Sequence, residues 1–128
     1  VADEEISLLQ SHFGSRARWV LCPRSNDYIE GAHPPTERLR KAGCRVAVGT
    51  DSLASNDSLS LVEELKAMPE VPLEERLRWA TIEGARALGV DDRFGSFEPG
   101  KRPGAVLLGG IDWGRMQLRA SAYAIRIL

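Results

Sequence analysis

Two short apolar segments, separated by a helical pattern, constrain the fold of this chain more than any other feature. They span residues 19–22 and 45–49. Short runs of this kind, without polar alternation, are typical of parallel strands that are covered on both faces. Between them, residues 34–43 carry a predicted helix with Leu39 and Ala42 facing inward. We therefore predict a parallel strand–helix–strand unit.

Helices are predicted on both sides of this unit, and the pattern changes after residue 90. Apolar spacing predicts one helix over residues 2–13, one that begins near Ser60, and a longer one over residues 72–89. Residues 91–128 hold short apolar segments between glycines, which predicts a small sheet. Two parallel strands need neighbours on both edges, and the chain begins without methionine. We therefore expect it to be a piece of a longer protein.

Composition argues against two classes of partner. Lys and Arg number 17 against 18 Asp and Glu, a formal net charge of −1, so no global field attracts nucleic acid or a membrane surface. No apolar run approaches the roughly 20 residues that span a bilayer. The two cysteines, Cys22 and Cys44, form no disulfide framework of the secreted kind. This pattern favours a reducing, cytoplasmic location.

An aspartate follows directly after the second apolar segment, in Gly49-Thr50-Asp51-Ser52. Active sites of parallel α/β proteins are assembled at this end of the strands. Asp51 is therefore a candidate metal ligand or general base. Capping of the following turn explains the same residue equally well, and position alone does not decide between them.

Polar residues hold the equivalent place after the first apolar segment, in Pro23-Arg24-Ser25-Asn26. If the two strand ends share one mouth, Arg24, Ser25 and Asn26 are placed to hydrogen-bond a polar substrate. The alternative is a proline-initiated turn in which Ser25 and Asn26 bond to the local backbone.

Cysteine and histidine add little chemistry. Cys22 lies inside an apolar segment with no histidine near it in sequence, which favours a buried structural thiol over a nucleophile. His12 and His33 lack partners at the i+2 or i+4 spacing with which two imidazoles bind one metal. Phosphate-binding glycine loops and a basic stripe interleaved with aromatic residues are also absent.

Five motifs follow one another along most of the chain. They are residues 21–26 (LCPRSN), 39–43 (LRKAG), 49–52 (GTDS), 80–89 (ATIEGARALG) and 95–101 (GSFEPGK). Their order resembles the C-terminal third of the amidohydrolase superfamily, in the branch of cytosine, guanine, S-adenosylhomocysteine and aminodeoxyfutalosine deaminases and the chlorohydrolases. The resemblance covers roughly residues 3–108.

The resemblance implies a metal-dependent hydrolase with an α/β fold. Its template is a distorted (β/α)8 TIM-like barrel, flanked by a β-sandwich that both chain termini build. On that template residues 1–90 form the last two βα units, with strands seven and eight at 19–22 and 45–49. Residues 91–128 form the C-terminal share of the composite sandwich.

The resemblance also implies roles at the site. It makes Asp51 the catalytic aspartate that binds a divalent metal, zinc or alternatively iron, and relays protons from the bound water. That water attacks a ring carbon that bears an amino group, ammonia leaves, and a carbonyl remains. Residues that bind the substrate or support the metal aspartate are implied at five positions: Arg24, Ser25, Asn26, Ser52 and Asn56.

The family's other metal ligands, a His-x-His pair and two later histidines, have no counterpart in these residues. One carboxylate cannot hold a catalytic zinc, so we expect this chain to be inactive and to bind no metal stably by itself. It is expected to be the C-terminal part of a homo-oligomeric deaminase of purine-like or other heterocyclic amines, with aminodeoxyfutalosine as a candidate substrate. The alternative is a non-catalytic α/β module that self-associates or binds a partner through its open strand edges.

Overall fold

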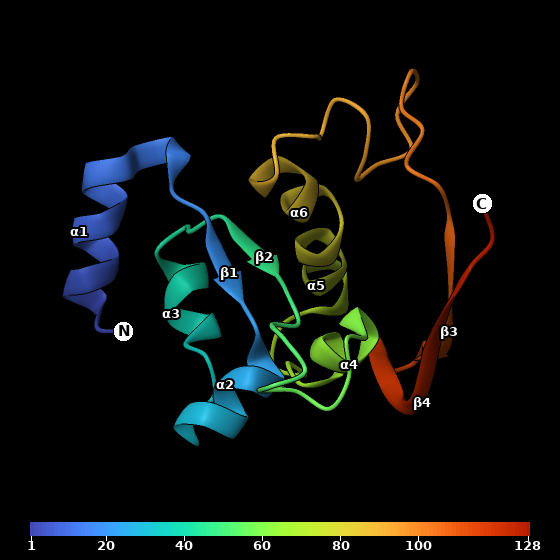
Figure 1. Cartoon of the computed structure of the whole chain (residues 1–128), viewed down its shortest axis with the longest axis horizontal. Coiled ribbons are helices and arrows are strands. Elements are labelled where there is room, and N and C mark those ends of the chain that lie inside the picture. The colour runs from blue at the N-terminus through green and yellow to red at the C-terminus, as the bar shows by residue number, and fades with distance from the viewer.

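The computed structural model describes all 128 residues and shows a mixed α/β chain (Figure 1), as predicted. In chain order its elements are α1 (Asp3–Phe13), the 3₁₀ turn η1 (Gly14–Arg16), β1 (Trp19–Leu21), α2 (Pro23–Glu30), α3 (Thr36–Lys41), β2 (Val46–Val48), α4 (Leu61–Lys66), α5 (Leu73–Ala80), α6 (Ile82–Ala87), β3 (Val106–Asp112) and β4 (Gln117–Arg126). None of the helices has the length and apolar character needed to cross a membrane.

The two predicted strands pair in parallel, with Trp19 opposite Val46 and Leu21 opposite Val48. β2 is buried along its whole length. In β1, however, Val20 is 58% exposed. The expectation that both strands are covered on both faces is therefore wrong for β1, since no element of this chain covers that side chain.

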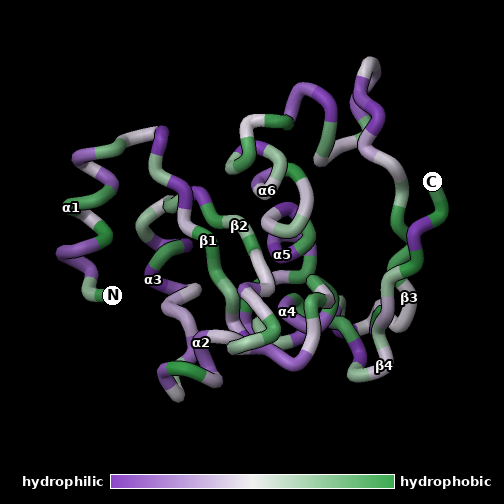
Figure 2. The backbone as a smooth tube through the Cα atoms, in the orientation of Figure 1, coloured by the Kyte–Doolittle hydropathy of each residue, from purple (hydrophilic) through white to green (hydrophobic).

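The hydrophobic core surrounds this strand pair. Helices from both sides contribute side chains to one cluster, and Figure 2 shows the hydrophobic colour along β1 and β2 at the centre of the molecule. The cluster consists of Ile6, Leu21, Leu39, Val46, Val48, Leu65, Met68, Val71 and Trp79. Because these side chains come from both strands, from α1, α3, α4 and α5 and from the segment between α4 and α5, the core fixes the strands relative to these helices.

Two helical segments differ from the sequence prediction. Residues 23–26, for which we weighed a turn, instead open helix α2, with Pro23 in its first turn. The predicted long helix over residues 72–89 is broken into α5 and α6 at Thr81, whose backbone lies at φ −123° and ψ −93°. The Thr81 hydroxyl donates to the carbonyl of Leu77 at 2.7 Å, a side-chain bond that competes with the helix ladder.

Helix α3 ends earlier than predicted. Leu39 is buried as expected, but Ala42 lies beyond Lys41, the last helical residue, and is exposed. The prediction that Ala42 faces inward is therefore wrong. Gly43 follows in the left-handed region at φ +66°, which is the usual conformation of a glycine that ends a helix.

The predicted small sheet of the tail is an antiparallel hairpin of β3 and β4. A register shift between Gly109 and Ile111 marks a bulge, and Gly110 adopts φ +77° there. Three side chains attach the hairpin to the rest of the chain: Lys66 donates to the carbonyl of Ala120, Arg76 donates to the side-chain oxygen of Gln117, and the Gln117 amide donates to the carbonyl of Pro69. The hairpin lies at the opposite end of the molecule from α1 (Figure 1).

Candidate active site at the carboxyl ends of the strands

The carboxyl ends of the two parallel strands lie side by side, which meets the condition under which residues 24–26 and Asp51 share one mouth. Asp51 follows β2 by three residues, and Ser25 lies in the first turn of α2, directly after β1. The Ser25 hydroxyl lies 2.8 Å from Asp51 Oδ2. Ser25 is 3% exposed, whereas the Asp51 side chain reaches the surface. A buried hydroxyl therefore holds an accessible carboxylate.

A second hydroxyl completes the support of Asp51. Ser55 Oγ lies 2.9 Å from Asp51 Oδ2 and 2.9 Å from Ser25 Oγ. The hydrogen bond from Ser25, followed by that from Ser55, lowers the pKa of Asp51 below its ordinary value. Both hydroxyls bind the same oxygen, and the carboxylate stays ionised at neutral pH.

The backbone of Asp51 is unusual. Its φ is +57°, in the left-handed region, which L-residues other than asparagine and aspartate rarely adopt. The Thr50 carbonyl before it accepts a hydrogen bond from Asn56 Nδ2 at 2.9 Å. The chain therefore bends sharply at Asp51, and this bend presents the carboxylate at the strand end.

A pocket of about 720 Å³ is lined in part by Ser55, a hydroxyl partner of Asp51, whereas Asp51 itself is not in its walls. Its walls come from the N-terminal part of α2 and from the loop after β2; they include Arg24, Asp27, Tyr28, Leu53, Ala54, Ser55, Asn56, Asp57 and Ala67. Two residues that we predicted to bind substrate, Arg24 and Asn56, line it. Ser25, Asn26 and Ser52 are not in its walls.

The predicted residues differ in how far their polar groups are used internally. Arg24 pairs with Asp57, but its Nη1 atom is buried without a hydrogen-bond partner. The amide nitrogen of Asn56 donates hydrogen bonds to the Thr50 carbonyl and to Glu64 Oε1. Ser52 accepts a hydrogen bond from the Ala54 N–H at 3.3 Å. Asn26 is half-buried, next to Ser25 in α2.

The prediction that Cys22 is a buried thiol is wrong, because Cys22, like Cys44, is only half-buried at the edge of the strand pair. Both cysteines are free, and burial raises the pKa of the Cys22 thiol and that of Cys44. A raised pKa keeps these thiols protonated and weakly nucleophilic. His33 lies between two carboxylates: its Nδ1 is 3.3 Å from Asp27 Oδ1 and its Nε2 is 3.4 Å from Glu70 Oε1.

A further pocket of about 780 Å³ does not belong to this site. It is lined by Arg45 and Val46 at the amino end of β2 and by side chains of α5 and α6, among them Trp79 and Glu83. In parallel α/β folds residues at that end serve stability rather than chemistry, and none of the predicted site residues lies there.

The residues at the strand ends fit one position of a metal site. No group of three or more His, Cys, Asp or Glu side chains in the chain is arranged to hold a metal ion. Asp51 offers an ionised, accessible carboxylate whose hydroxyl partners occupy only Oδ2. A catalytic zinc takes about three protein ligands and one open position, so the other ligands are not among these residues.

Sequence reasoning missed two residues of the site, Ser55 and Glu64. Glu64 is fully buried in α4 and accepts hydrogen bonds from the Arg24 N–H and from Asn56. A signal for it exists, because Glu64 precedes Leu65 and lies one helical turn before Met68, within an apolar stripe. Ser55 carries no comparable local signal.

Comparison with known proteins identifies the family. The model of the Amidohydrolase family matches residues 1–123. This chain belongs to the amidohydrolase family. A 5-methylthioadenosine/S-adenosylhomocysteine deaminase of Teredinibacter turnerae is 36% identical over 116 residues, which cover 82% of the chain and 26% of that relative.

Solved structures of amidohydrolases agree with this assignment. An adenosine deaminase from Xanthomonas campestris with bound zinc matches with a TM-score of 0.74 and 32% identity, over 84% of the chain and 26% of that structure. An aminofutalosine deaminase of Helicobacter pylori matches with a TM-score of 0.70 and 37% identity, over 80% of the chain and 27% of that structure. The chain thus spans about a quarter of the length of the relatives it matches.

Proposed function

We propose that this chain is the C-terminal part of a metal-dependent hydrolase that deaminates a heterocyclic amine. The observation that carries the proposal is the ionised Asp51 carboxylate at the carboxyl end of β2, held by Ser25 and Ser55. Deaminases among the relatives support the reaction class. In the proposed whole enzyme, residues 1–90 complete a (β/α)8 barrel and residues 91–128 contribute to a β-sandwich.

Asp51 is the metal ligand in this proposal. The metal is zinc, supported by the zinc in the Xanthomonas relative, with iron as the alternative, and the remaining ligands come from residues beyond this chain. When bound, the metal supplies a water molecule of lowered pKa. Asp51 would be placed to take a proton from that water as the water oxygen adds to the ring carbon, and to pass the proton to the amino group; the C–N bond would then break, ammonia would leave and a ring carbonyl would remain.

The surrounding residues divide into two roles. Ser25 supports Asp51 through its hydroxyl, and Asn56 supports the loop through its amide. Arg24 contacts the substrate, since its side chain lines the pocket. Asn26 and Ser52, on the elements that carry these supports, contribute further substrate contacts.

A purine-like amine is the proposed substrate class. The relatives are named for 5-methylthioadenosine, S-adenosylhomocysteine, adenosine and aminofutalosine, which share an aminopurine ring. The proposed enzyme is a cytoplasmic homo-oligomer, and two free cysteines agree with a reducing compartment.

The test uses the protein encoded by the whole gene. Purified with zinc, it is incubated with 5-methylthioadenosine, S-adenosylhomocysteine, adenosine, guanine and aminofutalosine, and ammonia release is measured. We expect release from at least one of them, loss of release in Asp51→Ala, and none from the 128-residue chain alone. A zinc-loaded protein that releases no ammonia would refute the reaction, and an active Asp51→Ala variant would remove Asp51 from it.

The same preparations test the non-catalytic alternative. Its support is the exposed Val20 on the open face of β1. Self-association of the 128-residue chain in sedimentation experiments, together with a whole protein that binds no metal, would favour that alternative.

A further inference from the structure

Glu64 is a carboxylate in a place where a hydrophobic side chain would be expected. Its side chain is fully buried on α4, next to the core residue Leu65. Burying a charge is costly unless it is hydrogen-bonded or paired. No cation forms an ion pair with Glu64, and the nearby Arg24 guanidinium pairs with Asp57 instead.

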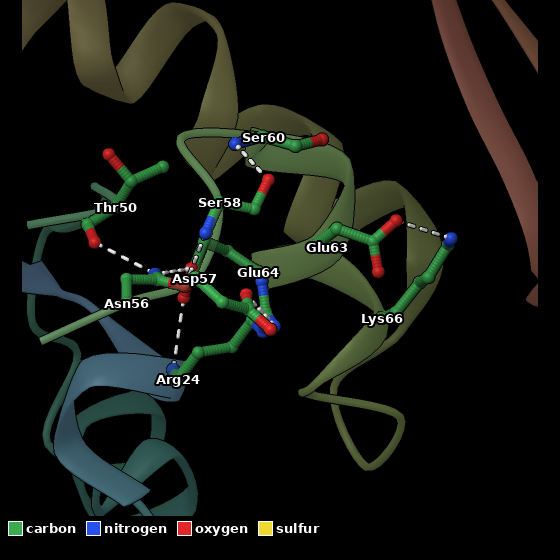
Figure 3. A network of polar contacts seen from close by, with 9 residues as sticks. All are labelled: Arg24, Thr50, Asn56, Asp57, Ser58, Ser60, Glu63, Glu64 and Lys66. Carbon is green, nitrogen blue, oxygen red and sulfur yellow. Dashed lines mark hydrogen bonds and ion pairs between the residues drawn. The ribbon is translucent and has the colours of Figure 1, made fainter. Parts of the chain in front are cut away.

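Two neutral donors satisfy this carboxylate. Oε2 accepts the backbone N–H of Arg24 at 3.0 Å, and Oε1 accepts the amide of Asn56 at 2.6 Å (Figure 3). These donors come from α2, which follows β1, and from the loop after β2. Glu64 therefore joins the two segments that meet at the candidate active site.

Each donor is adjacent to a support of Asp51. Arg24 precedes Ser25, whose hydroxyl binds the Asp51 carboxylate. Asn56 follows Ser55, the other hydroxyl partner of that carboxylate. Asn56 also donates to the carbonyl of Thr50, the residue before Asp51 (Figure 3).

Helix capping explains only part of this arrangement. A carboxylate near the first turn of α2 is favourable for the helix dipole, which accounts for the bond to the Arg24 N–H. It does not account for the bond to Asn56, which belongs to no helix. One carboxylate that holds both segments sets the distance between Ser25 and Asp51.

We propose that Glu64 is a positioning residue, which holds Ser25 and the 50–56 loop so that Asp51 presents its carboxylate to the metal. The proposal rests on the proposed function, in which Asp51 is the metal ligand. Glu64 itself touches neither metal nor substrate.

The test compares Glu64→Gln with Glu63→Gln in the whole protein. Glutamine has nearly the shape of glutamate, but it has only one carbonyl oxygen for two donors, so its NH₂ group must face either the Arg24 N–H or Asn56. Glu63 is the matched control, since it lies on the same helix and binds the partly exposed Lys66 at 2.7 Å. A third variant, Glu64→Met, fills the buried place without charge.

Three readouts are taken on variants whose thermal melts show a folded protein. The first is the visible spectrum of the Co²⁺-substituted protein, which reports the ligand geometry. The second is kcat and KM, and the third is hydrogen exchange of the amides in the 50–56 loop. We expect Glu64→Gln and Glu64→Met to change the spectrum, lower kcat by about 10- to 100-fold with little change in KM, and speed loop exchange. Glu63→Gln should match the wild type.

The possible contradictory results are distinct. A folded Glu64→Met variant with the wild-type spectrum and kcat would overturn the proposal, because the carboxylate would then be replaceable by volume alone. Equal effects of Glu64→Gln and Glu63→Gln would overturn it as well. If the wild type binds no metal and releases no ammonia, the proposed function fails, and loop exchange alone decides: faster exchange in Glu64→Gln sustains positioning of the loop, and unchanged exchange refutes it.

Discussion

The left-handed backbone at Asp51 predicts an inverted order of stability for two substitutions. At φ +57°, alanine is strained because its Cβ approaches the following carbonyl oxygen, a cost of roughly 1–2 kcal/mol. Glycine avoids this cost, but its greater freedom in the unfolded chain takes back about 0.5–1 kcal/mol. Asp51→Gly and Asp51→Ala both remove the carboxylate and its hydrogen bonds, so those losses cancel in the comparison. We therefore expect Asp51→Gly to be the more stable variant.

The difference is measurable by urea unfolding. The central values leave glycine ahead by about 0.75 kcal/mol, which with a slope of about 2 kcal/mol per molar urea corresponds to a midpoint higher by about 0.4 M. The assay follows far-ultraviolet circular dichroism of the two variants of the 128-residue chain.

A control position with ordinary backbone shows the opposite order. Gly84 lies within α6, and an added Cβ there would meet only the Trp79 carbonyl at 3.6 Å, an ordinary contact. Gly84→Ala should therefore stabilise the chain by up to about 1 kcal/mol. If alanine at position 51 is as stable as glycine while Gly84→Ala behaves as expected, the left-handed conformation of Asp51 is not the one that the chain adopts.

Three further predictions concern the scaffold. Gly110→Ala should destabilise the chain by about 2–4 kcal/mol, because its Cβ would lie 2.6 Å from a backbone atom of β4, whereas Gly114→Ala, with its nearest contact at 3.5 Å, should change the urea midpoint little. Met68→Ala should cost about 2–5 kcal/mol in the same assay, since Met68 is fully buried. Burial pushes the pKa of Glu70 upward, but hydrogen bonds led by that from Thr36 outweigh it, so the pKa lies below its ordinary 4.5. Glu70 therefore stabilises the chain above pH 4.5 and loses this effect as the pH falls through its folded pKa, so Glu70→Gln should lower the urea midpoint by more at pH 7 than at pH 3.

The strand pair was predictable from sequence because its signal is local. Short apolar runs lie within residues 19–22 and 46–49, and the structure pairs Trp19–Leu21 with Val46–Val48 in parallel. Helix α2 was missed for a physical reason as well. Proline, serine and asparagine favour turns when only local bonds are considered, and the Arg24 N–H is satisfied by Glu64, 40 residues away.

At the site, too, the residues with a local sequence signal were predictable, and those positioned by the folded backbone were not. Asp51 could be predicted as a candidate because it follows shortly after a predicted buried strand, and that position can be read from the sequence. The role of Ser55 depends on the left-handed bend at Asp51, which brings a residue four positions later back to the carboxylate. No periodic sequence pattern predicts such a bend, so the contact between the Ser55 hydroxyl and Asp51 could not be predicted without the backbone structure.

The support of Asp51, the proposed metal ligand, is contained within this chain, whereas no group of three or more side chains here could hold a metal ion. Ser25 and Ser55 hold the carboxylate from two segments, and Glu64 joins those segments by accepting hydrogen bonds from the Arg24 N–H and the Asn56 amide. A ligand whose orientation is fixed by its own neighbours loses little freedom when a metal binds. The geometry of this one ligand is therefore set by the C-terminal quarter of the proposed enzyme, and the remaining strands need only bring their ligands to it.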